Sequence, residues 1–387
     1  MSNTADVIII GGGIHGVSLA FHLAERGLKP LVLEKNFIAA GATGRSSGMV
    51  RMHYDVRQDS ELAWVSFGYF RNWAERVGGD CGFTRTGFIQ FVAREHEAAL
   101  RKNTAMQQEI GIPTFLITAD DVNRLAPAFL TDDFDFAAYE PESGYADPSA
   151  AAASFGTAAK EKGARILQDC AVTGVIVESG VVKGVHTSQG DFFAPVVVNA
   201  AGPWAEGLNQ MAGLDIPYTT WRHDTMFVGV PAELGPHFPA AIDFPNEMYY
   251  RPETGGLMLV GLEDGNPLGD SPEGDTDHAI KGFVERAIER ICQRIPVMEN
   301  SYLHTAHGGY DGFTPDQHPL LGQVGPEGFY LQCGMSGTGF KIAPAIGLCM
   351  SELILDGQAK TVDISIYHPG RFKARNEIQG TYESIWR

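Results

Sequence analysis

Residues 6–16 read DVIIIGGGIHG, an apolar run that ends in a cluster of glycines. The continuous apolar run over residues 7–10 is typical of a parallel strand covered on both faces. Gly11, Gly13 and Gly16 then fit the GxGxxG spacing of a dinucleotide-binding turn. That spacing permits a tight turn, a close approach to a pyrophosphate and close packing of the next helix on the strand. The stretch therefore predicts a Rossmann-like fold.

The residues that follow complete a strand-helix-strand unit. Apolar residues recur at helical spacing over 14–26, and residues 30–34 (PLVLE) have the pattern of a second short strand. The N-terminus of such a helix offers free N–H groups and partial positive charge to phosphates. Glu34 ends the second strand eighteen residues after Gly16, where a carboxylate can accept hydrogen bonds from ribose hydroxyls. The order of these features is a strong indication of nucleotide binding.

Length and composition exclude several other classes of protein. The 387 residues suit about two domains, and a hydrophobic content of 44% excludes a disordered chain. A net charge of −18 disfavours nucleic-acid binding and docking on an anionic membrane. No apolar run is long enough to cross a bilayer. Five scattered cysteines without CxxC spacing favour a reduced, cytoplasmic protein with no metal site.

Patterns further along the chain predict a second sheet. Alternation typical of strands occurs at 85–92, 225–230, 247–251 and 257–262, and helices are predicted at 60–75 and 277–295. Strands that resemble the nucleotide domain occur before, between and after these segments. We therefore expect an α/β protein in which a nucleotide domain (1–80, 145–215 and 315–387) is interleaved with a mostly antiparallel substrate domain (81–144 and 216–314). The active site is expected at their junction.

Four later segments, taken with the N-terminal unit, resemble one known family. They are residues 144–148 (GYADP), 197–204 (VVNAAGPW), 314–316 (TPD) and 334–341 (GMSGTGFK). In this order they are similar to the D-amino-acid-oxidase-type FAD oxidoreductases, and most similar to the sarcosine oxidase and glycine oxidase branch. The resemblance covers nearly the whole chain. It implies a Rossmann-like, parallel-sheet FAD domain of the GR2 type with helices, and FAD as the cofactor.

The resemblance also implies which residues contact FAD. The loop 41–48 is expected to wrap the pyrophosphate and the isoalloxazine, with Arg45 facing either a phosphate or solvent. The loop 334–339 is expected beside the flavin, where the next helix can stabilise negative charge on the reduced ring. The expected cofactor contacts are Gly11, Gly13, Ile14, His15, Gly16, Glu34, Lys35, Thr43, Arg45, Ser46, Ser47, Val172, Ala201, Gly202, Trp204, Gly334, Ser336, Gly337, Gly339, Phe340 and Lys341.

Arg51 and Lys341 match the two cations that grip the substrate carboxylate in the sarcosine oxidase branch. The planar fork of an arginine can bind both carboxylate oxygens. Tyr249 and Tyr250 are neighbours on a predicted strand, so only one can face the flavin, and Tyr250 is preferred. His53 follows Arg51 and can either line the pocket or support the structure. The expected catalytic residues are therefore Arg51, Lys341, Tyr250 and His53.

Three positions depart from patterns known in this family. Residues 306–311 hold no cysteine, the residue that attaches the flavin of covalent sarcosine oxidases shortly before the Thr-Pro-Asp motif, so we expect non-covalent FAD. Met258 is expected where monomeric sarcosine oxidases have a lysine that assists oxygen reduction. Asp311 stands where D-amino acid and glycine oxidases have a carboxylate-binding arginine. This last departure favours a carboxylate held by Arg51 and Lys341.

The resemblance implies oxidation of the C–N bond of a small amino acid or N-substituted glycine. A hydride leaves the carbon attached to the neutral amine for flavin N5, and water hydrolyses the imine. O2, giving H2O2, or another acceptor then takes the electrons. Two alternatives stay open: a secondary amino acid dehydrogenase subunit that passes electrons to a partner, and a non-catalytic flavin-binding protein. An NAD-linked dehydrogenase would leave the 334–339 loop unexplained.

Overall fold

Strand β1 (Val7–Ile10) lies inside a six-stranded sheet in the computed structural model, which describes residues 3–235 and 237–382. It pairs in parallel with β2 and β13, and only β19 runs antiparallel to its neighbour. The order is β19 (Leu320–Gln323), β20 (Phe329–Cys333), β13 (Val196–Asn199), β1, β2 (Pro30–Leu33) and β9 (Arg165–Leu167). The predicted Rossmann-like parallel sheet is confirmed.

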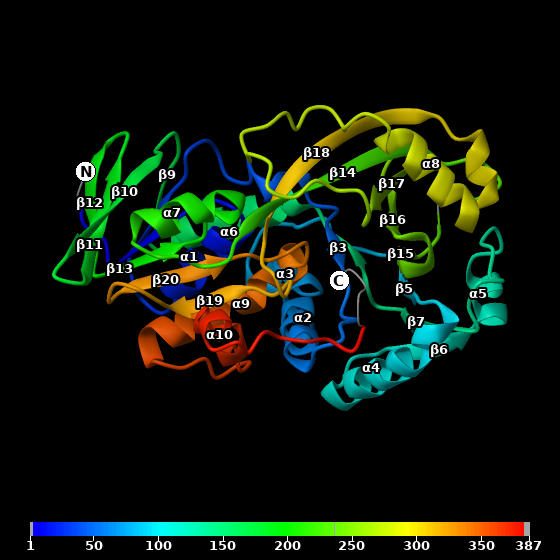
Figure 1. Cartoon of the computed structure of the whole chain (residues 1–387), viewed down its shortest axis with the longest axis horizontal. Helices are drawn as coiled ribbons and strands as arrows, with labels where there is room; N and C mark the ends of the chain where they lie inside the picture. Colours follow the sequence, from blue (N-terminus) through cyan, green and yellow to red (C-terminus); the bar gives the residue numbers. More distant parts are fainter. Residues whose placement is uncertain (1–2, 236, 383–387) are drawn as a thin grey trace.

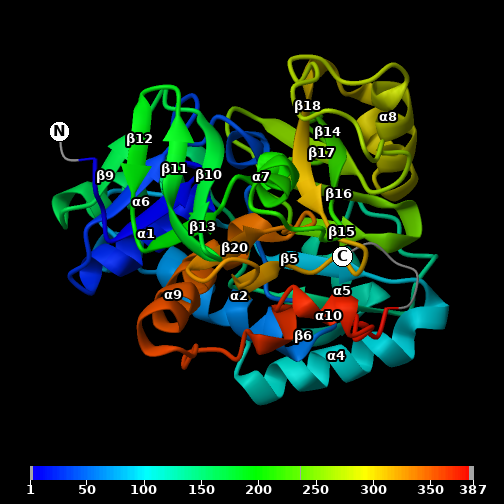
Figure 2. The ribbon, with the colours of Figure 1, turned by 60° about the vertical axis from the view of Figure 1, so that its left-hand side comes forward.

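Both faces of this sheet are covered, as the unbroken apolar sequence of β1 predicts (Figure 2). Val7 and Ile9 pack against a helical layer, whereas Ile8 and Ile10 pack on the opposite side. The helical layer consists of α1 (Ile14–Glu25), α2 (Arg57–Phe70), α6 (Pro148–Glu161) and α9 (Gly339–Asp356). The opposite side holds α7 (Ala205–Met211) and an antiparallel sheet of β10 (Val172–Glu178), β11 (Val181–Thr187) and β12 (Gly190–Phe193).

The second large sheet has eight strands and carries helix α8 on its outer face (Figure 1). Every neighbouring pair is antiparallel except β15 with β5. The order is β18 (Leu303–Phe313), β14 (Thr219–Gly229), β17 (Leu257–Leu262), β16 (Met248–Glu253), β15 (Ala240–Asp243), β5 (Phe88–Phe91), β7 (Phe136–Glu140) and β6 (Phe115–Thr118). The mostly antiparallel second sheet is therefore present as expected.

Two predicted helices differ from those in the structure. Helix α8 covers only Phe283–Arg294, because Gly282 at its N-cap is left-handed with φ +82°. The helix expected over 60–75 is divided into α2 and the short α3 (Trp73–Arg76). The remaining elements are β3 (Met49–Val50), β4 (Thr84–Arg85), α4 (Glu97–Ile110), α5 (Ala119–Leu125), β8 (Gly144–Tyr145), α10 (Gly370–Lys373) and six short 3-10 turns among the described residues.

The two large sheets draw their strands from alternating parts of the chain. The six-stranded sheet uses segments within 7–33, 165–199 and 320–333, and the eight-stranded sheet uses segments within 88–140 and 219–313. The boundaries proposed for the two domains stay a prediction. Of those ranges, residues 1–2, 236 and 383–387 lie outside the described part of the chain.

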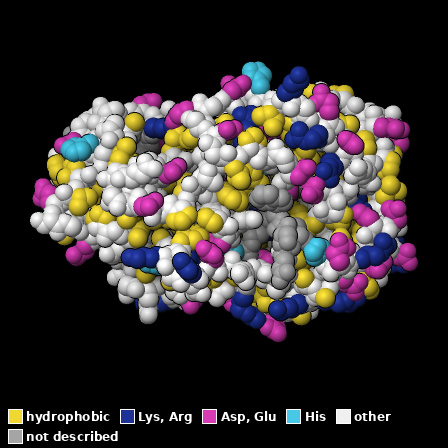
Figure 3. Space-filling view, viewed as in Figure 1, with side chains coloured by type: hydrophobic (Ala, Val, Ile, Leu, Met, Phe, Trp, Pro, Cys, Tyr) yellow, Lys and Arg dark blue, Asp and Glu magenta, His cyan; other side chains and the backbone are white. Residues whose placement is uncertain are grey.

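Acidic and basic side chains are interspersed on the face shown in Figure 3. The visible surface therefore carries no continuous basic stripe of the kind that tracks a nucleic-acid backbone. Within the described residues, no helix combines the length and the apolar content needed to cross a membrane.

Candidate active site

A cavity of about 440 Å³ runs between the two large sheets. Its wall continues from the turn after β1 to the inner face of the eight-stranded sheet, so that Glu34 and Tyr249 line the same space. Its volume lies within the usual range of about 300–1,000 Å³ for a cofactor or ligand site. The cavity therefore joins the expected nucleotide end to the expected substrate end.

The glycine turn forms a cradle at one end of the cavity. Gly11 has φ +111°, and a Cβ there would lie 2.5 Å from the carbonyl oxygen of Ala200. A Cβ on Gly16 would lie 2.0 Å from the carbonyl oxygen of Gly11. Gly16 therefore lets α1 pack against β1 and does not line the cavity. Gly13, at the N-cap of α1, has no side chain that could cap the helix, so first-turn N–H groups beyond that of Ile14 are available to an anion.

Glu34 and Thr43 hold the cradle in place. One carboxylate oxygen of Glu34 accepts from the backbone N–H of Gly12 at 2.7 Å, and the other accepts from that of Asn36 at 2.8 Å. The Thr43 hydroxyl accepts from the N–H of Ile14 at 3.0 Å. Each carboxylate oxygen of Glu34 has a further lone pair that can accept a ribose hydroxyl.

A loop of the second sheet covers the nucleotide end. The Oε1 atom of Glu273 accepts from Lys35 Nζ and from Trp204 Nε1, each at 2.6 Å. Arg45 donates to the Asp277 carboxylate at 3.0 Å while its stem lines the cavity. Of the two orientations expected for Arg45, the structure thus shows an ion pair at the rim.

Most of the residues expected at the cofactor line this one cavity. The exceptions are Gly16 and Ser336, whose hydroxyl hydrogen-bonds to the backbone of Thr314 and Gly334 and so supports the loop from behind. The residues that line the cavity as expected are Gly11, Gly13, Ile14, His15, Glu34, Lys35, Thr43, Arg45, Ser46, Ser47, Val172, Ala201, Gly202, Trp204, Gly334, Gly337, Gly339, Phe340 and Lys341. Their individual roles stay predictions.

Arg51 and Lys341 lie at the other end of the cavity, and both are buried. Arg51 is 3% exposed and donates to the carbonyl oxygen of His53, while its guanidinium lies over the Tyr54 ring. Lys341 reaches only the carbonyl oxygen of Gly337, at 3.5 Å. Neither cation forms an ion pair with a carboxylate of the described residues. Buried cations without an ion-pair partner favour an anionic ligand.

The charged groups at this end of the cavity shift one another's pKa values. Burial, and then the charge of Arg51, holds the pKa of Lys341 well below its usual value. Burial raises the pKa of Glu263 to about 7, although both cations lower it. Burial and the charge of Lys341 lower the pKa of the His223 imidazole to about 3, so this ring is neutral near pH 7. An incoming carboxylate would stabilise the protonated form of Lys341.

The preference for Tyr250 is wrong, because Tyr249 is the tyrosine that faces the cavity. Tyr250 is 0% exposed and lies in the core between the sheet and α8, where it contacts Phe129 edge-on. The same alternation corrects the position of Met258, which also lies in that core. On β17 the inner face carries Leu259, and β17 contains no lysine.

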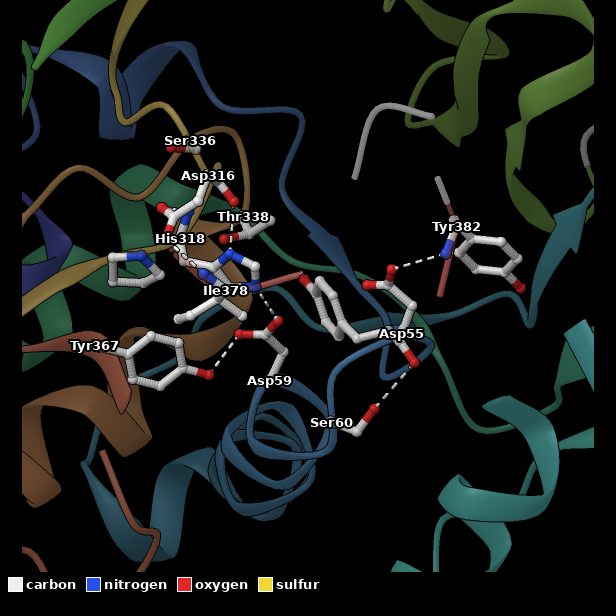
Figure 4. Close-up of polar contacts among 12 residues, drawn as sticks. Asp55, Asp59, Ser60, Asp316, His318, Ser336, Thr338, Tyr367, Ile378 and Tyr382 are labelled. Atoms are coloured by element: carbon white, nitrogen blue, oxygen red, sulfur yellow. Dashed lines mark hydrogen bonds and ion pairs between the residues drawn. The ribbon is translucent and has the colours of Figure 1, made fainter. Parts of the chain in front are cut away.

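His53 does not line the cavity, contrary to one of its two expected roles. Its Nε2 atom lies 2.8 Å from the hydroxyl of Tyr382, and burial lowers the pKa of the imidazole to about 3. The backbone N–H of Tyr382 donates to Asp55 at 3.1 Å, as Figure 4 shows. Because Arg51 donates to the carbonyl oxygen of His53, the segment that ends at Tyr382 supports Arg51 from behind.

A second set of contacts secures the same segment. Tyr367 donates to Asp59 at 2.6 Å, and His318 lies 3.2 Å from the other oxygen of that carboxylate (Figure 4). The backbone N–H of Ile378 donates to Asp316, the aspartate of the Thr-Pro-Asp motif, at 3.1 Å. The Thr-Pro-Asp motif therefore binds the chain after α10 through Asp316, and His318, two residues later, contacts Asp59 of α2. The motif does not line the cavity.

Comparison with known proteins now identifies the family. The model of the family described as FAD dependent oxidoreductase matches residues 6–353. The chain belongs to this family. The residues at the cradle fit FAD, because the first turn of α1 carries no acidic residue that would repel a phosphate and the cavity extends past Glu34 to Arg51. Gly11, Gly13, Glu34 and Thr43 would hold its adenosine and pyrophosphate part.

Individual relatives and one solved structure agree with this assignment. The chain is 28% identical over 389 residues to mitochondrial sarcosine dehydrogenase of Homo sapiens, covering 96% of this chain and 42% of that protein. It is 27% identical over 368 residues to sarcosine oxidase subunit beta of Rhizobium meliloti, covering 91% and 85%. The crystal structure of L-proline dehydrogenase from P. horikoshii matches with a TM-score of 0.90 at 29% identity, covering 98% and 100%. The chain spans less than half the length of the mitochondrial relatives.

Sequence reasoning missed several residues of this FAD-dependent oxidoreductase that line the substrate end of the cavity. Trp221 and His223 alternate on β14, with ring centroids 3.7 Å apart, and Glu263 directly follows β17. The predicted strands covered 225–230 and 257–262, so none of these three residues fell inside an alternating pattern. Only the position of α8, which covers the opposite face, shows which residues face the cavity.

Proposed function

We propose that this protein oxidises the C–N bond of a small secondary amino acid, such as an N-substituted glycine or proline. The observation that carries the proposal is the pair of buried cations, Arg51 and Lys341, without a carboxylate partner among the described residues. A substrate carboxylate would supply that partner. When bound, FAD supplies a two-electron acceptor for the hydride on the carbon attached to nitrogen.

The side chains around the two cations would orient the substrate. Arg51 can bind two carboxylate oxygens, and Lys341 can add a third donor from the N-terminal turn of α9. Tyr249 and His223 restrict the space beyond them. Since the cavity wall is continuous from Gly337 to Arg51, a carboxylate held there leaves the amino carbon close to the glycine loop. Orientation, rather than side-chain nucleophilic chemistry, would supply most of the rate acceleration.

A second candidate concerns the electron acceptor: a dehydrogenase that passes electrons to a partner instead of O2. Monomeric sarcosine oxidases have a lysine on the strand that corresponds to β17. Here the inner face of β17 carries Leu259 and Gly261, so no cation from this strand supports oxygen reduction. The names of two relatives, sarcosine dehydrogenase and L-proline dehydrogenase, support the same candidate. The name of the relative from Rhizobium meliloti, sarcosine oxidase subunit beta, supports O2 as the electron acceptor.

We also propose that FAD is bound without a covalent bond. Cys333 lines the cavity, but burial raises the pKa of its thiol to about 12. The nucleophilic thiolate is therefore scarce near neutral pH. Denatured protein should release all its FAD into the supernatant, and yellow colour retained in the precipitate would contradict this.

Anaerobic titration of the purified holoprotein tests the reaction. Sarcosine, N-ethylglycine and L-proline are added in turn, and loss of the visible flavin absorbance with one of them supports the proposal. Admission of air then separates an oxidase, which recovers its colour quickly, from a dehydrogenase, which recovers slowly. The variant Arg51→Gln should lower the second-order rate of reduction at least about thirtyfold, since a buried charged partner is worth about 2–5 kcal/mol.

The exposed Arg57 gives a matched control. It pairs with Glu109 at the surface, so Arg57→Gln should reduce at the wild-type rate. Equal losses in both variants, or no reduction of the wild type by any amino acid, would contradict the proposed function.

A further inference from the structure

Glu263 lies directly after β17 on the face of the sheet that lines the cavity. Its backbone N–H donates to the carbonyl oxygen of Glu247 at 2.8 Å, which extends the pairing with the preceding segment. Leu259 and Gly261 precede it at intervals of two residues, on the same face as the Tyr249 ring. The strand therefore directs this carboxyl toward the end of the cavity that Arg51 and Lys341 occupy.

The Glu263 side chain is buried, and among the described residues it has no hydrogen-bond or ion-pair partner. The neighbouring Asp264 differs, since its carboxylate forms an ion pair with Arg290 at 3.1 Å. A buried carboxyl without a donor is costly unless a ligand supplies one. Glu263 thus resembles Arg51 and Lys341 in lacking a local partner, but it carries the opposite charge.

The groups that face Glu263 come from several elements. Arg51 follows β3, and Lys341 lies in the first turn of α9. Both cations act electrostatically on Glu263, as does Asp264, the adjacent residue. Tyr249 on β16 is close enough that Glu263 raises the pKa of its hydroxyl. Asp311 also lines the cavity and acts on Lys341, but its carboxylate already accepts from the backbone N–H groups of Gly312 and Gly337. The cavity thus presents to a single small ligand two cations and one carboxyl that lacks a hydrogen-bond donor among the described residues.

We propose that Glu263 binds the amine nitrogen of the substrate and accepts its ammonium proton. This inference rests on the proposed function, because it assumes an amino acid whose carboxylate lies on Arg51 and Lys341. An amino acid in solution carries an ammonium group one carbon away from its carboxylate. Of the acidic side chains that line the cavity, Glu263 is the one without a partner among the described residues.

In the proposed step a proton moves from the substrate ammonium group to Glu263, and no other reactant is needed. One N–H bond of the ammonium breaks, its electron pair stays on nitrogen, and the proton forms an O–H bond with the Glu263 carboxylate. The amine becomes neutral and can support loss of hydride from the adjacent carbon, while the carboxyl becomes uncharged. Burial raises the pKa of Glu263 to about 7, so near neutral pH the group can hold or release this proton.

The experiment compares the holoenzyme with Glu263→Gln, Glu263→Asp and Glu289→Gln. Glu289 is an exposed residue of α8, so its variant makes the same chemical change away from the cavity. Sarcosine is compared with (methylthio)acetate, which replaces the N–H group by sulfur and keeps the carboxylate. The rate of anaerobic flavin reduction is followed against pH, and binding of (methylthio)acetate is followed by the flavin difference spectrum.

We expect Glu263→Gln to lower the second-order rate of reduction by sarcosine about ten- to a hundredfold near neutral pH, the range for one lost charge-assisted hydrogen bond. The difference from the wild type should shrink as pH approaches about 10, where alkylammonium groups lose their protons in solution. Affinity for (methylthio)acetate should stay equal or rise, because a negative group near its carboxylate has been removed. Glu263→Asp should restore part of the rate near neutral pH, and Glu289→Gln should match the wild type.

Equal weakening of both ligands in Glu263→Gln would overturn the proposal, because Glu263 would then only shape the cavity. An unchanged pH profile would overturn it as well. Failure of the proposed function has a different signature, in which no amino acid reduces the wild-type flavin. In that case the role of Glu263 is tested by binding affinity, measured by calorimetry. The wild type must bind sarcosine more tightly than (methylthio)acetate, and Glu263→Gln must bind the two ligands equally.

Discussion

The ring of Tyr249 lies directly across Gly261 on the neighbouring strand. A Cβ on Gly261 would lie 2.1 Å from Cζ of that ring and 2.3 Å from its hydroxyl oxygen. The two residues are also register partners between β16 and β17. The missing side chain at 261 is therefore what allows the tyrosine to lie against the sheet instead of extending into the cavity.

Gly261→Ala should displace the Tyr249 ring into the substrate end. We expect apparent substrate affinity to fall about five- to a hundredfold, because overpacking at such a contact costs about 1–3 kcal/mol. Anaerobic reduction at several substrate concentrations measures this effect. The double variant Gly261→Ala/Tyr249→Ala removes the clash and should bind better than Gly261→Ala alone. Poorer binding by the double variant would show that the clash is not the cause.

Tyr250→Phe should leave flavin reduction unchanged. Its hydroxyl is buried in the core and has no hydrogen-bond partner among the described residues. Removing such a hydroxyl abolishes a desolvation cost, so the free energy of unfolding should stay the same or rise by about 1 kcal/mol. Chemical denaturation of both proteins measures it. Tyr249→Phe is the matched change on the cavity side, and it alone should alter the visible flavin spectrum.

Gly11→Ala should abolish FAD binding. The added Cβ would lie 2.5 Å from the carbonyl oxygen of Ala200, and φ +111° is unfavourable for alanine. Gly27→Ala is the matched control, since Gly27 also has a positive φ of +88° but no heavy atom within 4 Å of the added Cβ. The control should lose about 1 kcal/mol of stability and keep its FAD. FAD content after gel filtration distinguishes the two, and equal retention would contradict the assignment of the cradle.

Carboxylate binding should weaken as pH rises, for two reasons. Glu263, with a pKa of about 7, becomes negative and repels the ligand. Lys341 loses its proton well below the usual lysine pKa of 10.5, because of burial and then the charge of Arg51. In Lys341→Arg the part of the loss that comes from Lys341 should disappear, because guanidinium stays charged. Titration of both proteins with (methylthio)acetate from about pH 6 to about pH 10, across the ordinary range of these groups, measures the two contributions.

Local patterns account for what the sequence predicted correctly. The turn around Gly11 and Gly13 and the carboxylate of Glu34 belong to one continuous strand-helix-strand unit, so spacing alone places them. Strand alternation correctly predicted that Tyr249 and Tyr250 face opposite sides. It could not tell which side is inner, because that depends on where α8 packs.

The residues that sequence reasoning missed depend on distant packing. Glu263 lies outside the apolar pattern of β17, and its position becomes informative only when Arg51 and Lys341 are beside it. His53 stands two residues after Arg51 in the sequence, yet its ring contacts Tyr382, a residue 329 positions later. No pattern around residue 53 contains that partner.

The contact between His53 and Tyr382 also has a consequence for folding during translation. One edge of β1 can pair with β2 early, but the other stays open until β13 is made, since Val7 pairs with Val196. The support behind Arg51 is incomplete until residue 382 has left the ribosome. Such long-range closure slows folding and prolongs the exposure of apolar segments. The nascent chain should therefore depend on chaperones more than a protein whose strands pair in sequence order, and the end of the cavity around Arg51 should be among the last parts to form.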